Sequence, residues 1–163
     1  MGKKLTRRQI RDSAFLLLFE KELRNDDPIE VIYDLSEEYE EINICDDVKN
    51  KVEGIIQKTD ELDGKIASFS EKRKLQRIPK VNLTILRIAF YEILYEEKTP
   101  TNVAINEAVL MSRAYAFKED TSFVNGVLSS FAKSLGDKNV NGMIDTNVIN
   151  ESVDKQGAVA ENV

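Results

Sequence analysis

The amino-acid sequence predicts an all-α fold, a helical bundle of about six to seven helices in two small subdomains of about three helices each. Apolar residues recur at spacings of three and four along most of the chain, which is the period of a helix with one buried face. The 163 residues include only 7 glycines and 3 prolines, and so few breaks favour long elements. Apart from Asn141-Gly142 near the end of the chain, no hairpin turn or alternating pattern indicates a sheet.

The first helix is predicted from about Thr6 to Leu23. Thr6 and Gln9 have the spacing of a capping box, in which each side chain satisfies a backbone N–H of the other residue. The apolar residues that follow cover almost the whole circumference, which is typical of a central, buried helix. The first turn is unusual, because the positive end of the helix dipole favours acids and this chain places bases there. Those bases are Lys4, Arg7 and Arg8.

Two further helices are predicted in the first half of the chain. A turn at residues 25–28 leads into the second helix, because proline suits the first helical position. We expect the third helix to run from about Asp46 to Phe69 as one element with an apolar face, although Gly54 and Gly64 lie inside it. The apolar stripe of the second helix consists of Ile29, Ile32, Leu35, Tyr39 and Ile42.

Pro79 marks the predicted boundary between the two subdomains, because proline disfavours helical geometry at the preceding Ile78. Beyond it, Asn82 is expected to cap a fourth helix, with a fifth at about 101–117 and a sixth at about 121–135. We therefore predict one helical domain over residues 1–135, divided into subdomains 1–78 and 79–135. From Gly136 the apolar period stops, so residues 136–163 are predicted to form a flexible C-terminal tail.

The composition argues against most classes of enzyme. The chain has no histidine, which is the commonest acid–base group near neutral pH and the commonest metal ligand. A glycine-rich phosphate loop and a recognisable nucleophile motif are both absent. We therefore expect no enzyme activity, no metal site and no cofactor.

Cellular location is also constrained by the composition. The single cysteine, Cys45, cannot form an internal disulfide or a thiolate metal cluster, which favours a reducing compartment. The basic start lacks the apolar stretch of a signal peptide, and no segment approaches the roughly 18 apolar residues that span a membrane. We expect a cytoplasmic protein that does not bind membranes.

Charge is distributed unevenly along the chain, whose net charge is −6. The three arginines near the start are spaced to share one side of the first helix, and such a patch can contact RNA phosphates with strong salt dependence. The alternative is that these bases only form surface pairs with acids of the next helices, which would contribute little to stability. A second basic run at 72–80 is explained equally well by a solvated connection. The bases at the start are Lys3, Lys4, Arg7, Arg8 and Arg11.

An unusual glycine, Gly126, lies inside the sixth predicted helix. Glycine in a helix interior costs roughly 1 kcal/mol relative to alanine, so its presence needs a reason. Close packing against another helix is one explanation. The other is that Phe123 and Asn125 border a surface on which an RNA base can stack and form hydrogen bonds.

Four strings of the chain together resemble one known family. They are RRQIRDSA at 7–14, RIPKV at 77–81 together with ILRIAFYE at 85–92, VAINEAV at 103–109 and FVNGVL at 123–128. In this order, spread over residues 6–135, they resemble the NusB family of transcription antitermination proteins. The remaining residues, from Gly136 onward, fall outside the resemblance.

The resemblance implies two small helical subdomains and an RNA-binding factor that pairs with NusE, a ribosomal protein of the small subunit. The pair would bind a boxA element in single-stranded nascent RNA and help RNA polymerase to resist termination, notably on ribosomal RNA operons, as part of an antitermination complex. Carried over by position, the NusE surface falls on the fourth helix around Tyr91 and Glu92. RNA contacts are expected at Lys3, Lys4, Arg7, Arg8, Arg11, Lys118, Phe123 and Asn125.

The chain departs from the family pattern at several positions. Leu16 and Phe19 stand where glutamine and tyrosine are frequent, and Phe19 can stack but has no hydroxyl to donate. Arg73 and Asn82 stand where tryptophan and aspartate are frequent. Two alternatives remain open, which are a helical adaptor that binds only protein and the RNA-binding domain of an RNA-modifying system. The sequence also leaves open whether the free protein forms a homodimer.

Overall fold

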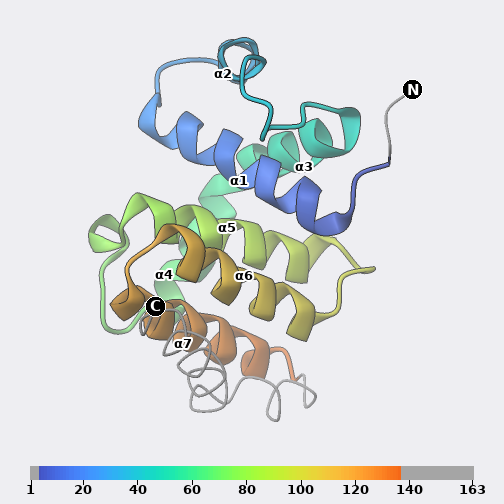
Figure 1. Cartoon of the computed structure of the whole chain (residues 1–163). Helices are drawn as coiled ribbons and strands as arrows, with labels where there is room; N and C mark the ends of the chain where they lie inside the picture. Colours follow the sequence, from blue (N-terminus) through green and yellow to red (C-terminus); the bar gives the residue numbers. More distant parts are fainter. Residues whose placement is uncertain (1–3, 137–163) are drawn as a thin grey trace, which may run out of the picture.

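The computed structural model describes residues 4–136, which form seven α-helices and one short 3-10 helix and contain no β-strand (Figure 1). The predicted all-α class is confirmed, and within this range no helix is both long and apolar enough to cross a bilayer. Most of the predicted tail, residues 137–163, lies outside the described residues. The elements are α1 (Arg7–Leu23), α2 (Ile29–Ser36), α3 (Asp46–Gln57), α4 (Thr59–Phe69), η1 (Leu75–Arg77), α5 (Lys80–Tyr95), α6 (Thr101–Tyr115) and α7 (Lys118–Ser134).

The start of α1 is fixed by the capping box that the sequence predicts. The Thr6 hydroxyl accepts a hydrogen bond from the backbone N–H of Gln9 at 3.1 Å, and the Gln9 side chain accepts one from the N–H of Thr6 at 2.8 Å. Further along the helix, Ala14, Phe15 and Leu17 are almost completely buried. The prediction of a capped, central first helix is therefore confirmed.

The predicted third helix is in fact two helices, and the break does not occur at a glycine. α3 ends at Gln57 and α4 begins at Thr59, with Lys58 between them at φ −101° and ψ 7°. The Thr59 hydroxyl donates to the carbonyl oxygen of Ile55 at 3.0 Å, a side-chain bond that competes with the helical ladder. The break therefore follows from local hydrogen bonding of Thr59, which the apolar pattern does not report.

Three other boundaries differ from the predicted ones. α2 ends at Ser36, so Tyr39 lies beyond the helix. The backbone N–H of Tyr39 donates to the carbonyl oxygen of Ser36 at 3.1 Å. α5 begins at Lys80 directly after Pro79, so Asn82 is no cap and is instead fully buried inside the first turn. α7 begins at Lys118, one turn before the predicted start. Proline fixes the backbone just before α5, which makes a polar cap unnecessary there.

α5 packs against most of the other helices of residues 4–136. α1 and α6 lie along it, α4 and α7 also pack against it, and α7 lies beyond α6 in Figure 1. The rings of Phe90 on α5 and Phe131 on α7 stack with their centroids 4.1 Å apart. The buried apolar side chains form one cluster that includes helices on both sides of residue 78. The division into subdomains 1–78 and 79–135 stays a prediction.

Candidate nucleic-acid interface

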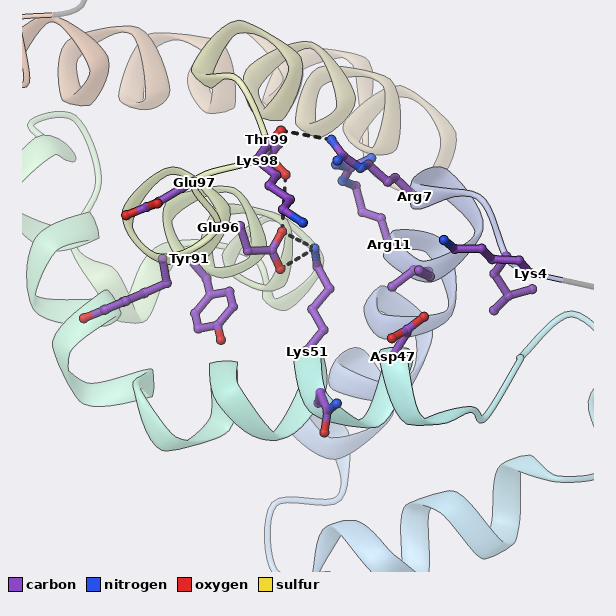
Figure 2. A pocket seen from close by; sticks show the side chains of 14 residues that line it. Lys4, Arg7, Arg11, Asp47, Lys51, Tyr91, Glu96, Glu97, Lys98 and Thr99 are labelled. Carbon is purple, nitrogen blue, oxygen red and sulfur yellow. Dashed lines mark hydrogen bonds and ion pairs between the residues drawn. The ribbon is translucent and has the colours of Figure 1, made fainter.

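The start of α1 carries three exposed bases, Lys4, Arg7 and Arg8, which we call the basic patch. The first turn of α1 contains no acidic residue, so the positive end of the helix dipole adds to their charge. The Arg7 guanidinium donates to the carbonyl oxygen of Lys98 at 3.0 Å, which draws the α5–α6 connection up to the patch (Figure 2). The patch can therefore attract an anion from solvent. Lys3, also predicted to contact RNA, lies outside the described residues.

Arg8 is held in place without being buried. Its Nη2 lies 2.8 Å and its Nε 3.2 Å from the two carboxylate oxygens of Glu107 on α6. The Arg8 side chain nevertheless remains 63% exposed, whereas that of Glu107 is only 15% exposed. Because the pair already restricts the Arg8 side chain, less conformational entropy is lost when Arg8 binds a phosphate.

Arg11 does not belong to the basic patch, so the predicted grouping of Arg11 with Arg7 and Arg8 on one exposed surface is wrong, and the burial of Arg11 argues against an RNA contact. Only 3% of its side chain is exposed, because it points between α1 and α5. Its Nε and Nη2 donate to the two carboxylate oxygens of Glu92, each at 2.8 Å. Burial acts to lower the pKa of Arg11, but the hydrogen bonds and charge of Glu92 outweigh burial and raise it. Arg11 is therefore a permanently charged group of the interior.

Glu92 is also buried, which argues against its predicted role as a partner contact. Its exposed fraction is 0%, and Lys51 on α3 approaches its carboxylate to 2.7 Å. Lys51 in turn lies 3.0 Å from Glu96. We call Arg11, Lys51, Glu92 and Glu96 the charge cluster, which joins α1, α3 and α5. A paired network of this kind fixes how the helices pack, because removing one member leaves the charges that remain in the interior only partly compensated.

An open pocket of about 750 Å³ lies beside the basic patch, where the start of α1 meets α3 and the end of α5 (Figure 2). Lys4 and Arg7 line it on the α1 side, and Tyr91 and Tyr95 line it on the α5 side. Burial raises the pKa of Tyr91, so its hydroxyl stays protonated at neutral pH and can donate a hydrogen bond. Tyr91 is half-buried and accessible from the pocket. Its role as a partner contact stays a prediction.

Gly54 on α3 allows Tyr91 to lie against that helix. A Cβ at position 54 would meet Cζ of the Tyr91 ring at 2.9 Å. This is closer than two carbon atoms can approach without displacing one another. The glycine that the sequence analysis treated as a possible interruption of the helix therefore has a packing function at the floor of the pocket.

The second group of predicted RNA contacts lies at the start of α7. Lys118 is exposed, and Phe123 is half-buried. The guanidinium of Arg73 lies 4.6 Å from the centroid of the Phe123 ring and is held there by Asp120 at 2.8 Å. Arg73 therefore covers one face of Phe123 and adds a cation to the surface around it.

Asn125 does not border this surface, which argues against its predicted role as an RNA contact. Its side chain is 2% exposed, because it lies on the same helical face as the buried residues Thr121 and Leu128. Gly126 beside it is exposed, and a Cβ there would meet no other atom within 4 Å. Close helix packing therefore does not account for Gly126.

Sequence reasoning missed Phe117, the residue that precedes α7. It is 76% exposed, the largest exposed fraction among the large hydrophobic side chains of residues 4–136. Its neighbour Lys118 is exposed as well. An aromatic face beside a cation is a surface on which a nucleobase can stack. The sequence could have indicated this exposure, because Phe117 lies where one predicted helix ends before the next begins, outside the apolar face of either one.

The basic patch and the start of α7 lie at different places along α6. Arg8 contacts Glu107 in the first half of that helix, whereas α7 begins just after α6 ends at Tyr115. At about 1.5 Å per residue, Glu107 and Tyr115 are roughly 12 Å apart along the helix axis. A ligand that touches both surfaces must therefore span at least about 12 Å.

Comparison with known proteins identifies relatives over most of the chain. Residues 8–133 match the model of the NusB family. Transcription antitermination protein NusB of Acetivibrio thermocellus is 38% identical over 128 residues, which cover 78% of this chain and 88% of that protein. The protein of the same name from Clostridium acetobutylicum is 36% identical over 139 residues, which cover 82% of this chain and 100% of that protein.

Solved structures share the fold. T. maritima NusB superimposes with a TM-score of 0.71 at 31% identity, covering 80% of this chain and 93% of that one. A crystal structure of antitermination factors NusB and NusE in complex with double-stranded RNA matches with a TM-score of 0.68 at 27% identity, covering 78% of this chain and 96% of that one. The family model, the sequence relatives and the shared fold agree, and the chain belongs to the NusB family.

Proposed function

We propose that this protein is an RNA-binding transcription antitermination factor that acts with NusE on a boxA-type element of nascent RNA in the cytoplasm. In this role it supports processive transcription of ribosomal RNA operons within an RNA polymerase antitermination complex. The observation that carries the proposal is the basic patch, whose bases are exposed at the start of α1, where the positive end of the helix dipole adds to their charge. The names of the relatives and the solved complex of NusB, NusE and RNA support it.

RNA recognition in this proposal uses two kinds of contact, to phosphates and to bases. Arg7 and Arg8 supply phosphate contacts, which give affinity and strong salt dependence but little sequence selectivity. Selectivity comes from bases that leave the stack and lie on aromatic side chains. Phe123, covered by Arg73 on one face, and the exposed Phe117 are the aromatic groups at the start of α7 that can serve this purpose. Lys118 adds a phosphate contact next to them.

NusE docks at the pocket beside the basic patch in this proposal. Tyr91 and Tyr95 offer an apolar surface with hydroxyl groups, and their ring centroids lie 5.3 Å apart. Tyr95 is 40% exposed, so it can replace the buried Glu92 as the second partner contact. Because Lys4 and Arg7 line the same pocket, a protein bound there would lie next to RNA held by the basic patch. The role is binding and carries no catalytic step.

The experiment measures the affinity for boxA RNA and for NusE separately and together, by fluorescence anisotropy at one salt concentration. If the two ligands bind adjacent surfaces and contact each other, each should raise the affinity for the other by the same factor. We expect a factor of about ten or more, which corresponds to roughly 1.4 kcal/mol of coupling. RNA binding without coupling would leave an RNA-binding domain and remove joint recognition. NusE binding without RNA binding would favour the adaptor that binds only protein.

A further inference from the structure

A second concave surface lies on the other side of α1 from the pocket of Figure 2. It is a groove of about 620 Å³ between the second half of α1, the end of α2 and the end of α6. Leu35, Tyr39 and Tyr115 line it and are 45%, 58% and 44% exposed. Three large side chains exposed in one groove form a contiguous apolar surface, which is uncommon on a protein without a partner.

The floor of the groove is rigid. Phe19, Phe15 and Tyr115 form a row of stacked rings, with centroids 5.9 Å apart in the first pair and 4.6 Å apart in the second. The wall is the segment 34–42, which consists of the last residues of α2 and the turn after it. The backbone beyond this segment is fixed, because the Asn43 N–H donates to the Ser13 hydroxyl at 2.9 Å. The groove therefore exists before any partner binds, which lowers the entropy lost on binding.

The charge around the groove is strongly negative. Asp34, Glu38 and Glu41 line it and are all exposed. The one basic lining residue, Arg24, is already paired with Glu20 at 2.6 Å and lies 3.6 Å from Asp27. An apolar floor with an unneutralised acidic rim is complementary to a segment with apolar side chains on one face and lysine or arginine beside them.

The same charges argue against the other candidate occupants. RNA phosphates would be repelled by the acidic rim. A symmetric pair of copies joined through this groove would bring two identical acidic rims together. Residues 137–163 of this chain contain five acids and two bases, so their charge has the same sign as the rim. None of the three offers the positive charge that the rim requires.

We propose that this groove binds a basic amphipathic helix of a partner protein. Two or three large apolar side chains of that helix would lie on the Phe19–Tyr115 floor, at helical spacing, and its flanking bases would pair with Glu38 and Glu41. Such helix-in-groove recognition takes affinity from the apolar anchors and specificity from the charged rim. The groove is separate from the basic patch, so a protein bound here leaves Arg7 and Arg8 accessible to RNA.

The test uses a fluorescein-labelled amphipathic peptide, LKKLLKLLKKLLKL, as the probe. Its binding is compared between two double variants that change the net charge equally, Glu38→Lys with Glu41→Lys and Glu37→Lys with Glu40→Lys. All four acids are exposed in the same short segment, but only the first pair lines the groove. We expect the groove pair to weaken peptide binding at least tenfold relative to the control pair. Leu35→Ser, which changes no charge, should weaken binding at least fivefold.

Equal effects of the two charge pairs would overturn the proposal, because the peptide would then sense only the overall charge. Loss of single-stranded RNA binding in Leu35→Ser would assign the groove to RNA. A dimer in sedimentation that Leu35→Ser dissociates would assign it to a second copy of the chain. Thermal melts by circular dichroism check that each variant folds. If the lysine variants unfold, Glu38→Gln with Glu41→Gln against Glu37→Gln with Glu40→Gln gives the same comparison with a smaller charge change.

Discussion

Arg8 and Arg11 lie three residues apart on the same helix, yet they belong to regions of opposite character. Arg8 is 63% exposed in the basic patch, and Arg11 is 3% exposed in the charge cluster. Both pair with carboxylates, but Glu107 holds Arg8 at the surface whereas Glu92 holds Arg11 in the interior. Counting the basic residues of a sequence segment therefore overstates how many of them a ligand can reach. The acid that each base pairs with decides whether the base lies at the surface or stabilises the interior.

The largest expected effect comes from removing a member of the charge cluster. Arg11→Gln leaves Glu92 in the interior with Lys51 as its remaining cation, so we expect a loss at the low end of the about 3–5 kcal/mol that breaking a buried ion pair costs. Urea unfolding followed by circular dichroism measures this loss. Arg8→Gln is the matched control, and its free energy of unfolding should change little because exposed pairs contribute little. Equal free energies of unfolding in the two variants would show that the charge cluster contributes no more to stability than the basic patch does.

The contact between α3 and α5 next to the charge cluster gives the next largest effect. Gly54→Ala would force its Cβ against the Tyr91 ring, and overpacking of this kind costs about 1–3 kcal/mol. Gly64→Ala on α4 is the control, because no atom lies within 4 Å of its Cβ and the free energy of unfolding should rise by about 0.5–1 kcal/mol. Equal changes in the two melting temperatures would show that the Tyr91 side chain can move away from α3 at little cost.

On the side of the basic patch, Arg7→Gln with Arg8→Gln should weaken RNA binding at least tenfold, which is about 1.4 kcal/mol. The free energy of unfolding should stay nearly unchanged, because both side chains are exposed. Anisotropy titrations with a labelled boxA RNA measure the affinity. Lys21→Gln with Arg24→Gln removes the same charge from the other end of α1 and should have little effect. If both pairs weaken binding equally, RNA responds to overall charge rather than to the patch.

The smallest expected effect is at Phe117, where Phe117→Ala should weaken RNA binding about fivefold, at the low end of the free energy of base stacking. The chain contains no tryptophan, so Phe117→Trp provides the only indole signal. RNA with bases should quench its fluorescence, and an abasic strand of the same length should not. Leu110→Trp, at another exposed apolar position, is the control. Equal quenching by both strands would show that no base stacks at Phe117.

Local signals in the sequence were sufficient to predict much of the fold. The capping box of Thr6 and Gln9 and the central position of α1 follow from short-range spacing, and the structure confirms both. The break at Lys58 was missed because it depends on the hydroxyl of Thr59 bonding to the backbone, which leaves the apolar period intact. The supposed cap at Asn82 was wrong because Pro79 already sets the start of α5.

The functional residues were harder to predict, and the reasons differ between them. Arg11 is buried and pairs with Glu92, which lies 81 positions away in sequence, so no local sequence pattern could have predicted its burial. Asn125 could have been placed correctly, since its spacing from Thr121 and Leu128 puts it on the inner face of α7. Arg7, Arg8 and Lys118 are exposed, and their RNA contacts stay predictions.

The salt dependence of RNA binding in Arg8→Gln and Arg11→Gln tests the central distinction most directly. Each phosphate contact to a single strand contributes about 0.7 to the slope of log affinity against log salt. Measured at a temperature where circular dichroism shows both variants folded, Arg8→Gln should lower the slope by about 0.7, and Arg11→Gln should leave it unchanged. An equal fall in both would mean that Arg11 reaches a phosphate and would contradict the division between the basic patch and the charge cluster.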